Sequence, residues 1–429
     1  MPIAARHRTF LILQGPLSPL YARLADALEG AGSTVHRINL CFGDWLHWRR
    51  PGAVAYRGRV RDWPDFVDRF MADNGITDLI LHGDRRIYHR LAADCARRRS
   101  IRVIATELGY LRPDWMTIER DATSTGSHFP DDPDAIRAIA EKVPEPDLTP
   151  IYRGSFFKVA FPDVVYNLSN VLFTPLWPHY RRHTIYHPVP EYLAWIARLT
   201  GEKRRNREAG DVVERLKRSA IPFFVFPMQL EGDFQIRDHS PFDGMADALR
   251  PVIASFAANA SEEAHLLIKG HPLDNGLENW PKTIGAIVSA YDLDDRIHYL
   301  DGGRLDEMLP FATGMVTVNS TAGIEALMHG CPTKTLTPAI YDIEGLTDRR
   351  ELYDFWSAPE PPDEELLAAF IRALTGTVQV RGSIYNDDGL KAAVENMAER
   401  ILSRRLNMPD AYVDPPPRLD RARALGAPL

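Results

Sequence analysis

The sequence has no long apolar run. Because no stretch of about 18 consecutive apolar residues occurs, it predicts no membrane-spanning helix. The first apolar run, from Thr9 to Leu13, is too short for the core of a signal peptide and is better interpreted as a β-strand. We therefore expect a cytoplasmic protein that contacts a membrane only from the surface.

Cysteine is scarce, and the chain has no excess of positive charge. Cys41, Cys95 and Cys331 are far apart and show no C-x-x-C spacing, which argues against a disulfide framework or a zinc site. The formal net charge is −7, so the chain lacks the overall basic character of a nucleic-acid-binding protein. We expect no nucleic acid among its partners.

Several nucleotide motifs are missing as well. Neither G-x-G-x-x-G after a first strand nor G-x-x-x-x-G-K-[ST] is present, which disfavours a dinucleotide dehydrogenase and a P-loop kinase. No D-x-D pair is suitably placed for Mn²⁺ or Mg²⁺. The sequence therefore predicts no metal site and no cofactor.

Strands and helices alternate along much of the chain, which predicts an α/β protein with two Rossmann-like domains. Predicted strands lie at 9–13, 35–40, 77–81 and 101–106, and again at 222–227, 264–268, 297–300 and 314–318. A helical insertion without strong strands separates the two sets. The predicted segments are an N-terminal domain (1–135), the insertion (136–209), a C-terminal domain (210–380), and a C-terminal helix with an extended tail (381–429).

Polar residues follow two of the predicted strands in the second half. Lys269 and Gly270 end the run at 264–268, and Pro272 prevents further ladder pairing, so His271 lies at a strand end. After 314–318 the chain continues into a turn at 319–321 and then a helix, an arrangement that suits an anion. A plain turn and an ordinary N-cap are the alternatives, but two such strand ends in one sheet favour a nucleotide pocket.

Two further segments are candidates for chemistry. The segment 226–242 places Gln229, Asp233 and other polar side chains next to aromatic residues, although a solvated loop would also account for it. The segment 105–121 places Glu107 at a strand end with Arg112 five residues later. A surface ion pair is the alternative there, and the large residues that follow suggest a packed loop.

The order and the amino-acid sequences of these segments resemble those of the bacterial capsule-synthesis family, in particular its KpsS/LipB-like β-Kdo transferases. The resemblance rests on FLILQGPLSPLYARLADALEGAGSTVHRINLCFGDWLHW, ELGYLR, QLEGDFQIRDHSPF, KGHPLD and NSTAGIEALMHGCPTKTL, and it spans roughly residues 8 to 350. Relatives that extend the sugar linker usually have Asp and Ser where this chain has Met228 and Gln235. That departure supports the single-module subgroup that adds the first sugar.

The resemblance implies a metal-independent, retaining transferase with a modified GT-B fold that uses CMP-β-Kdo as its donor. Asp233 matches the family's nucleophile, and Glu107 matches a second carboxylate that would activate the acceptor hydroxyl. The predicted donor-binding residues are Gln229, Lys269, His271, Pro272, Asn319, Ser320, Thr321 and Glu325, with Gln14, Arg112, Gln235, Arg237 and His239 as additional polar candidates.

The implied acceptor is phosphatidylglycerol or its lyso form at the inner leaflet of the inner membrane, with other capsule-assembly enzymes as further partners. Aromatic and basic residues of the insertion could form a weak peripheral membrane patch. That patch would comprise Trp177, Tyr180, Tyr186 and Trp195 with the basic clusters 181–183 and 203–205. Helices packed on a core with a solvated charged face are an equally good explanation.

Two other functions remain open. A nucleotide-sugar 2-epimerase or another GT-B enzyme with a UDP-sugar would also place His and Ser or Glu near a donor. A non-catalytic scaffold for capsule assembly or export is the alternative from a different class, but it leaves the polar loop at 229–239 unexplained.

Overall fold

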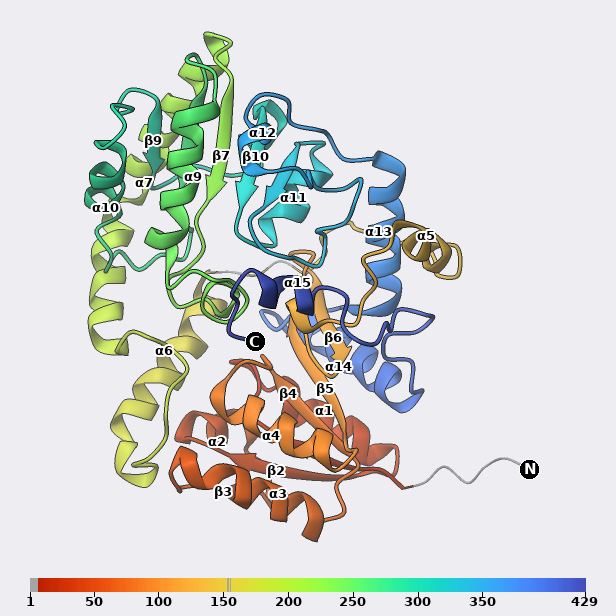
Figure 1. Cartoon of the computed structure of the whole chain (residues 1–429). Coiled ribbons are helices and arrows are strands. Elements are labelled where there is room, and N and C mark those ends of the chain that lie inside the picture. The colour runs from red at the N-terminus through yellow and green to blue at the C-terminus, as the bar shows by residue number, and fades with distance from the viewer. Residues whose placement is uncertain (1–6, 153, 155) are drawn as a thin grey trace. The chain divides into compact units, whose positions relative to one another are not determined.

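A computed structural model describes residues 7–152, 154 and 156–429, and the chain in it forms two compact units (Figure 1). Each unit is assembled from stretches that are separate in the sequence. The first unit comprises Met1–Phe129, Ile139–His183 and Arg372–Pro416, and the second comprises Pro130–Ala138, Thr184–Ile371 and Pro417–Leu429. The helices α5 (Pro133–Ala140) and α13 (Glu364–Thr377) run across these limits in the chain.

The first unit is built on a seven-stranded sheet in the order β12-β6-β5-β4-β1-β2-β3. Its strands are β1 (Thr9–Ile12), β2 (Thr34–Asn39), β3 (Val54–Ala55), β4 (Asp78–His82), β5 (Arg102–Leu108), β6 (Trp115–Arg120) and β12 (Gln379–Arg381). Its helices are α1 (Leu20–Gly30), α2 (Phe42–Trp48), α3 (Trp63–Asp73), α4 (Ile87–Arg98), α6 (Phe156–Leu172) and α14 (Asp387–Leu402), with the short 3-10 helices η1 (Val60–Asp62), η2 (Ser124–Gly126) and η3 (Thr174–Leu176).

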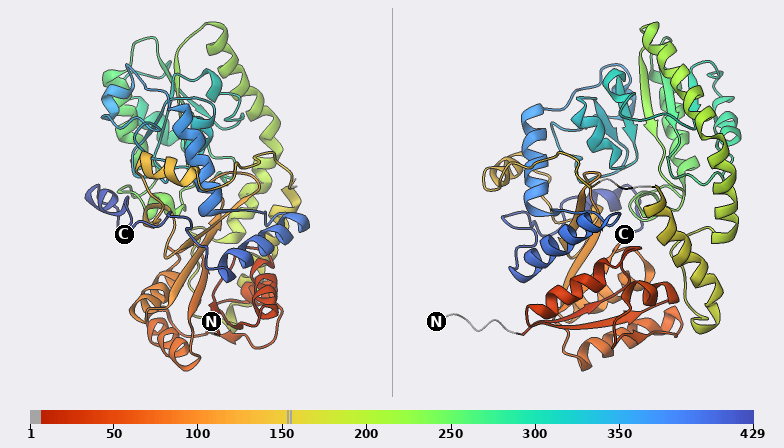
Figure 2. Two further views of the ribbon diagram at one scale, coloured as in Figure 1. Left: turned by 90° about the vertical axis from the view of Figure 1, so that its right-hand side faces the viewer. Right: turned by 180° about the vertical axis from the view of Figure 1, so that it is seen from behind.

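Helices cover both faces of this sheet, because its central strands are apolar on both sides. On β1, Phe10 and Ile12 pack against α1 and α14, whereas Leu11 and the following Leu13 pack against α3 and α4. Figure 2 shows α1 in front of the sheet in the rear view, and Figure 1 shows α4 in front from the opposite side. The strands from β5 to β3 are parallel, and β6 and β12 extend the sheet with antiparallel pairing.

The second unit is built on a five-stranded parallel sheet in the order β11-β10-β7-β8-β9. Its strands are β7 (Phe223–Pro227), β8 (His265–Lys269), β9 (Ile297–Leu300), β10 (Gly314–Thr317) and β11 (Thr333–Thr335). Its helices are α7 (Pro188–Arg218), α8 (Phe234–Arg237), α9 (Met245–Asn259), α10 (Trp280–Val288), α11 (Ala322–Met328), α12 (Leu352–Phe355) and α15 (Leu419–Ala424), with the 3-10 helix η4 (Leu309–Phe311).

Its core also alternates along the strands. Phe224 and Phe226 of β7 pack with α9 and α10, whereas Phe223 and Val225 pack against the last turns of α7. The predicted α/β fold with two Rossmann-like sheets is thus confirmed, and every predicted strand is present. The modified GT-B arrangement of the two halves stays a prediction.

The unit limits do not follow the continuous segments predicted at 1–135, 136–209, 210–380 and 381–429. The C-terminal helix, α14, packs on the first sheet beside α1, since its apolar face (Leu390, Met397 and Ile401) completes that core. The insertion is shared, with α6 in the first unit and α7 in the second. The tail, expected to be extended, contains α15.

The segment 105–121, interpreted as a packed loop, is mostly strand. Here β5 continues to Leu108 and β6 returns antiparallel to it, with Glu107 opposite Thr117. None of the described helices is both long enough and apolar enough to span a membrane.

We predict that Met397→Ala lowers the free energy of unfolding by about 2–5 kcal/mol, since its buried side chain fills the core between α14 and the first sheet. Lys391→Ala, on the exposed face of the same helix, is the control and should change it by no more than about 0.5 kcal/mol. Urea denaturation followed by circular dichroism measures both. Equal effects from the two variants would contradict the packing of α14 on this core.

Candidate functional site

Three polar loops of the second unit follow neighbouring strands. The sheet order places β7 between β10 and β8, and all three strands are parallel, so the loops leave from the same edge. The loop after β7 carries Gln229 and Asp233, the loop after β8 carries His271, and the turn after β10 carries Asn319 and Ser320. These predicted donor residues therefore share one edge of the sheet.

Asn319 joins the first and third of these loops. The Gln229 amide donates a hydrogen bond of 3.1 Å to Asn319 Oδ1, and Asn319 Nδ2 donates to the backbone oxygen of Gln235 at 2.9 Å. The same nitrogen lies 3.5 Å from the backbone oxygen of His239. Because Asn319 is only 5% exposed, these bonds form away from competing water. They fix the loop that carries Asp233.

One buried oxygen atom beside Asn319 has no hydrogen-bond donor among the described residues. Gln229 is buried, and its Oε1 has no hydrogen-bond partner among the described residues. Buried polar atoms in native proteins are nearly always satisfied by protein, water or ligand. Gln229 is thus a residue of this edge that still has capacity to bind.

Asp233 is the N-cap of α8. Its carboxylate accepts a hydrogen bond of 2.9 Å from the backbone N–H of Gln235, so one oxygen is held and the side chain is oriented. Nearby Glu231 is used differently, because its carboxylate accepts from the backbone N–H of Met245 at the start of α9. Burial raises the pKa of Glu231.

The ring of His271 is held in one orientation. Its Nδ1 accepts a 3.0 Å hydrogen bond from the backbone N–H of Leu273, so the neutral ring carries its proton on Nε2. The buried Lys269 does not project beyond the strand, because Nζ donates to the backbone oxygen of Gly270 at 2.7 Å. Desolvation lowers the pKa of Lys269 to about 8.

Helix α7 holds the loop that carries His271. Glu191 accepts a 3.2 Å hydrogen bond from Asn275, and Arg198 forms a bidentate pair with Asp301 at 2.6 and 3.1 Å. Arg198 also packs against Gly276, whose φ of +74° favours glycine. The contacts to Asn275 and Gly276 restrain the loop, and the Arg198–Asp301 pair joins α7 to the end of β9.

The other predicted donor residues occupy more varied places. The Ser320 hydroxyl accepts from the backbone N–H of Ala322 at 3.2 Å and can still donate its proton. Thr321 is the N-cap residue of α11, and Pro272 is exposed. The charged neighbours of half-buried Glu325 are Asp306, His329 and Arg304, and exposed Arg237 lies over the ring of Phe234.

The first unit has a second polar edge, where β5, β4 and β1 are neighbours. Glu107 Oε1 lies 3.5 Å from Nε2 of His82, the last residue of β4. A methyl group at Gly83 would lie 3.3 Å from both Glu107 Oε2 and Arg86 Nε, and its φ is +71°. Glycine at this position therefore allows the carboxylate and the guanidinium to approach each other.

At this edge the carboxyl group of Glu107 has a raised pKa. Desolvation raises the pKa of Glu107, even though 41% of the side chain is exposed, and Arg86 and Arg112 oppose the rise. Burial, assisted by Arg86, lowers the pKa of His82 well below its ordinary value, so the ring is neutral at pH 7. A carboxyl with a raised pKa beside a neutral imidazole is suited to proton transfer.

Gln14 connects this edge to the rest of its unit. Its Oε1 accepts a 3.2 Å hydrogen bond from Arg86, and its Nε2 donates to the hydroxyls of Tyr166 and Tyr180 at 2.7 and 3.2 Å. Arg112 donates instead to the backbone oxygen of Gly109. The sequence therefore predicted Gln14 and Glu107 as site residues but not His82 and Arg86. The polar turn that directly follows the strand at 77–81 could have indicated them.

Glu107 and Asp233 belong to different units, so their pairing stays a prediction. The absence of a metal requirement also stays a prediction. Within the described residues, no group of three or more His, Cys, Asp or Glu side chains is placed to hold a metal ion.

Comparison with known proteins gives consistent results. The profile of the family described as "Capsule polysaccharide biosynthesis protein" matches residues 77–385. The chain is 30% identical over 379 residues to "Capsule polysaccharide export protein KpsS" of Escherichia coli, covering 88% of this chain and 97% of that one. It is 30% identical over 383 residues to "Capsule polysaccharide modification protein LipB" of Neisseria meningitidis serogroup B, covering 88% and 91%.

Among solved structures, a similar one is the KpsC β-Kdo 2,7 transferase of Thermosulfurimonas dismutans. The TM-score is 0.41 at 14% identity, over 91% of this chain and 99% of that chain.

We predict that Asn319→Ala destabilises the second unit by about 1–3 kcal/mol, because Gln229 and the backbone oxygen of Gln235 lose a buried partner. Asn259→Ala is the control, since that amide bonds only to a backbone oxygen at an exposed helix end. Differential scanning calorimetry measures both. A destabilisation by Asn319→Ala no larger than that of the control would contradict the bridging role.

We predict that Glu107→Gln stabilises the protein at pH 7. A carboxyl whose pKa is raised by folding binds its proton more tightly in the native state, so stability falls as pH rises from the unfolded to the folded pKa. Glutamine removes that penalty, and the gain should disappear as the pH falls below the unfolded pKa, where the carboxyl is protonated in both states of the wild type. Melting temperatures across this pH range, with exposed Glu365→Gln as control, test this. A gain independent of pH would refute it.

Proposed function

Since the chain belongs to the capsule polysaccharide biosynthesis protein family, we propose that it is a glycosyltransferase that moves β-Kdo from CMP-β-Kdo to phosphatidylglycerol or its lyso form with retention. The proposal is supported by one observation: the loops that carry Asp233, His271 and Asn319 follow the neighbouring parallel strands β7, β8 and β10 at one edge of the sheet. Open α/β sheets bind their ligands at this edge.

In this proposal the second unit binds the donor. The Nε2–H of His271 and the hydroxyl of Ser320 donate hydrogen bonds to the phosphate of CMP, with Pro272 and Thr321 beside them. The orientation of the imidazole supports this role, because its Nδ1 is already occupied by a backbone N–H. Fixed donors of this kind stabilise the charge that develops on a departing phosphate without a metal ion, so no cofactor is proposed.

The chemistry proceeds in two displacements. Asp233 attacks the anomeric carbon of Kdo, the bond from that carbon to the CMP phosphate breaks, and a glycosyl-enzyme ester forms. The acceptor hydroxyl then attacks the same carbon and releases Asp233, while Glu107 takes the hydroxyl proton. Two inversions give net retention. The raised pKa of Glu107 supports this assignment, since the carboxylate is a better base than an ordinary one.

The acceptor makes this a reaction at the cytoplasmic surface of the inner membrane. We propose peripheral association through the insertion, together with contacts to other capsule-assembly enzymes that supply or use the product. The aromatic members of the predicted patch are mostly not exposed: Trp177 is 8% exposed, and Tyr180, Tyr186 and Trp195 are partly buried.

A second candidate is a non-catalytic role in capsule assembly or export, favoured by the name of the Escherichia coli relative. A transferase that uses another nucleotide sugar is a third. The candidates differ in what they bind, because an export scaffold needs no nucleotide and a UDP-sugar enzyme prefers UDP.

We predict that CMP raises the melting temperature more than UDP does. His271→Ala should lower the affinity for CMP about tenfold, which is the effect of losing one hydrogen bond to a charged group, and the rise in melting temperature should fall accordingly. The control is the substitution His329→Ala, at an exposed histidine at the end of α11.

Incubation of the protein with CMP-β-Kdo should increase its mass by one Kdo, and Asp233→Asn should abolish this adduct. A response to UDP alone, or to neither nucleotide, would refute the proposal.

A further inference from the structure

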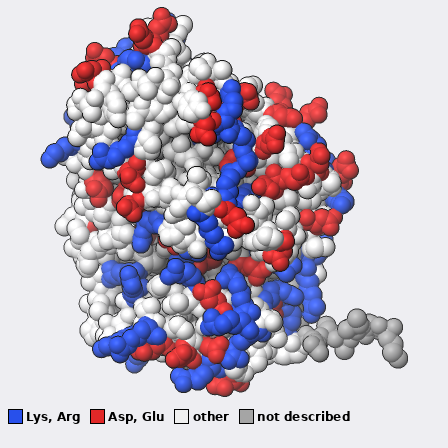
Figure 3. Space-filling view, viewed as in Figure 1, with Lys and Arg blue, Asp and Glu red and all other residues white. Residues whose placement is uncertain are grey.

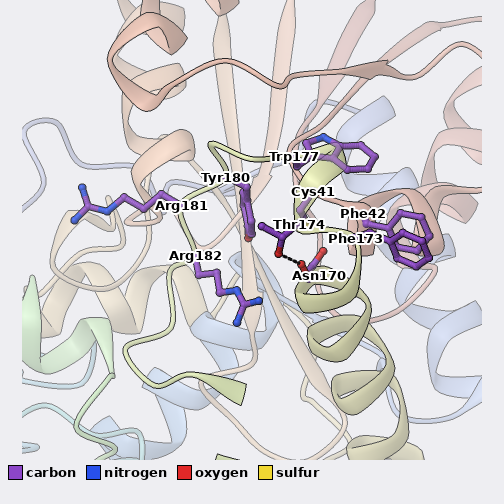
Figure 4. A pocket seen from close by; sticks show the side chains of 9 residues that line it. All are labelled: Cys41, Phe42, Asn170, Phe173, Thr174, Trp177, Tyr180, Arg181 and Arg182. Atoms are coloured by element: carbon purple, nitrogen blue, oxygen red, sulfur yellow. Dashed lines mark hydrogen bonds between the residues drawn. The ribbon is translucent and has the colours of Figure 1, made fainter. Parts of the chain in front are cut away.

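The first unit contains a cavity of about 370 Å³ beside α2, α6 and η3 (Figure 4). Phe42 and Phe173 stack at 4.0 Å on one side, and Asn170, Trp177, Tyr180 and Arg182 contribute polar atoms. Apolar walls with a few polar groups are typical of a small-molecule site. Neither the predicted donor residues nor the predicted catalytic residues line this cavity.

Two N–H donors in the cavity wall lack acceptors. The Nη1 of Arg182 and the Nε1 of Trp177 are both buried, and neither has a hydrogen-bond partner within the described part of the chain. Arg57 adds a positive charge 5.4 Å above the Trp177 ring. Figure 4 shows the guanidinium of Arg182 directed toward Asn170 and Thr174, while Arg181 points away. A ligand with anionic oxygens would satisfy both donors.

The cavity is connected to Glu107. Tyr180 lines it and accepts a hydrogen bond from Gln14, which in turn accepts one from Arg86. Arg86 lies beside Glu107 across Gly83. A ligand in this cavity is thus separated from the carboxyl by a short chain of polar contacts, all within the first unit.

The outer face of α6 carries an exposed apolar stripe. Phe161, Val165, Leu168 and Leu172 recur at helical spacing and are 69%, 37%, 41% and 72% exposed. On the opposite face of the same helix, Tyr166 and Asn170 are buried. A stripe of this kind normally packs against a partner or a membrane.

Charge identifies the partner as an anionic surface. No acidic residue occurs between Asp163 and Glu191, whereas this stretch holds Arg181 and Arg182. Figure 3 shows Lys and Arg side chains gathered at the lower left, where Figure 1 shows α2, α3 and α6. Apolar side chains flanked by positive charge suit an anionic bilayer. A second copy of this face would oppose like charges.

We propose that this cavity and the α6 stripe form the binding site for an anionic glycerophospholipid. Its headgroup phosphate accepts a hydrogen bond from Arg182, another oxygen of the lipid accepts one from Trp177, and the stripe (Phe161, Val165, Leu168 and Leu172) enters the outer part of the bilayer. The inference rests on the proposed function only in taking this lipid as the acceptor. It directs the headgroup hydroxyls past Tyr180 toward Gln14 and Arg86, the side of the cavity on which Glu107 lies.

The test is cosedimentation of the full chain with vesicles of phosphatidylcholine, with and without phosphatidylglycerol. The wild type should prefer phosphatidylglycerol vesicles. Phe161→Ser with Leu172→Ser should weaken binding to them about tenfold or more through lost apolar burial, and Arg182→Gln should remove most of the preference for phosphatidylglycerol. Melting temperatures verify that each variant folds.

Two matched controls separate this site from general surface effects. Arg181 also lines the cavity, but its guanidinium points away from Asn170 and Thr174 in Figure 4. Arg181→Gln therefore removes the same charge without removing the buried donor, and its effect should disappear at high salt, unlike that of Arg182→Gln. Phe311→Ser removes a ring that is 55% exposed in the second unit and should change nothing. Equal losses from Arg181→Gln and Arg182→Gln at high salt, or wild-type binding without lipid preference, would overturn the site.

The wild-type protein is also tested for stabilisation by CMP, so that the two proposals can fail separately. A lost CMP response with intact lipid preference would count against the proposed function and support the lipid site. A normal CMP response without lipid preference would overturn the lipid site alone.

Discussion

Neighbouring parallel strands end at the same edge of a sheet, and both candidate sites depend on this constraint. In the second unit it brings Gln229, His271 and Asn319 to one edge, although long helices separate them in the chain. In the first unit it does the same for Gln14, His82 and Glu107. Fully buried strands such as β4 and β7 make these edges rigid, so the loops begin from fixed positions.

At each edge a carboxamide links the loops. Asn319 accepts from Gln229 and donates to a backbone oxygen, and Gln14 accepts from Arg86 and donates to tyrosine hydroxyls. An amide donates and accepts at once and carries no charge, so it can be buried at lower cost than a carboxylate or a guanidinium. The charged groups, Asp233 and Glu107, remain more accessible, as acids that react with a substrate must be.

Sequence patterns were sufficient for the strands and for the polar residues at their ends, because both depend on local apolar runs and the breaks that follow them. They did not reveal β6, whose pairing with β5 is a tertiary contact across a proline-containing turn. The packing of α14 on the first sheet and the lipid-site cavity also went unpredicted, since residues such as Phe42 and Phe173 meet only in the fold. Unsatisfied donors, such as Trp177 Nε1, cannot be recognised without coordinates.

The contacts of Arg86 explain how Glu107 can keep a raised pKa beside a guanidinium. Arg86 directs hydrogen bonds to Gln14 Oε1 and to the backbone oxygen of Gly15, which restrain its Nη1. Its attraction lowers the pKa of Glu107 by less than desolvation raises it. Gln14 is in turn held by Tyr166 and Tyr180. The position of the guanidinium that faces the carboxyl therefore depends on Gln14 and on the two tyrosines that hold it.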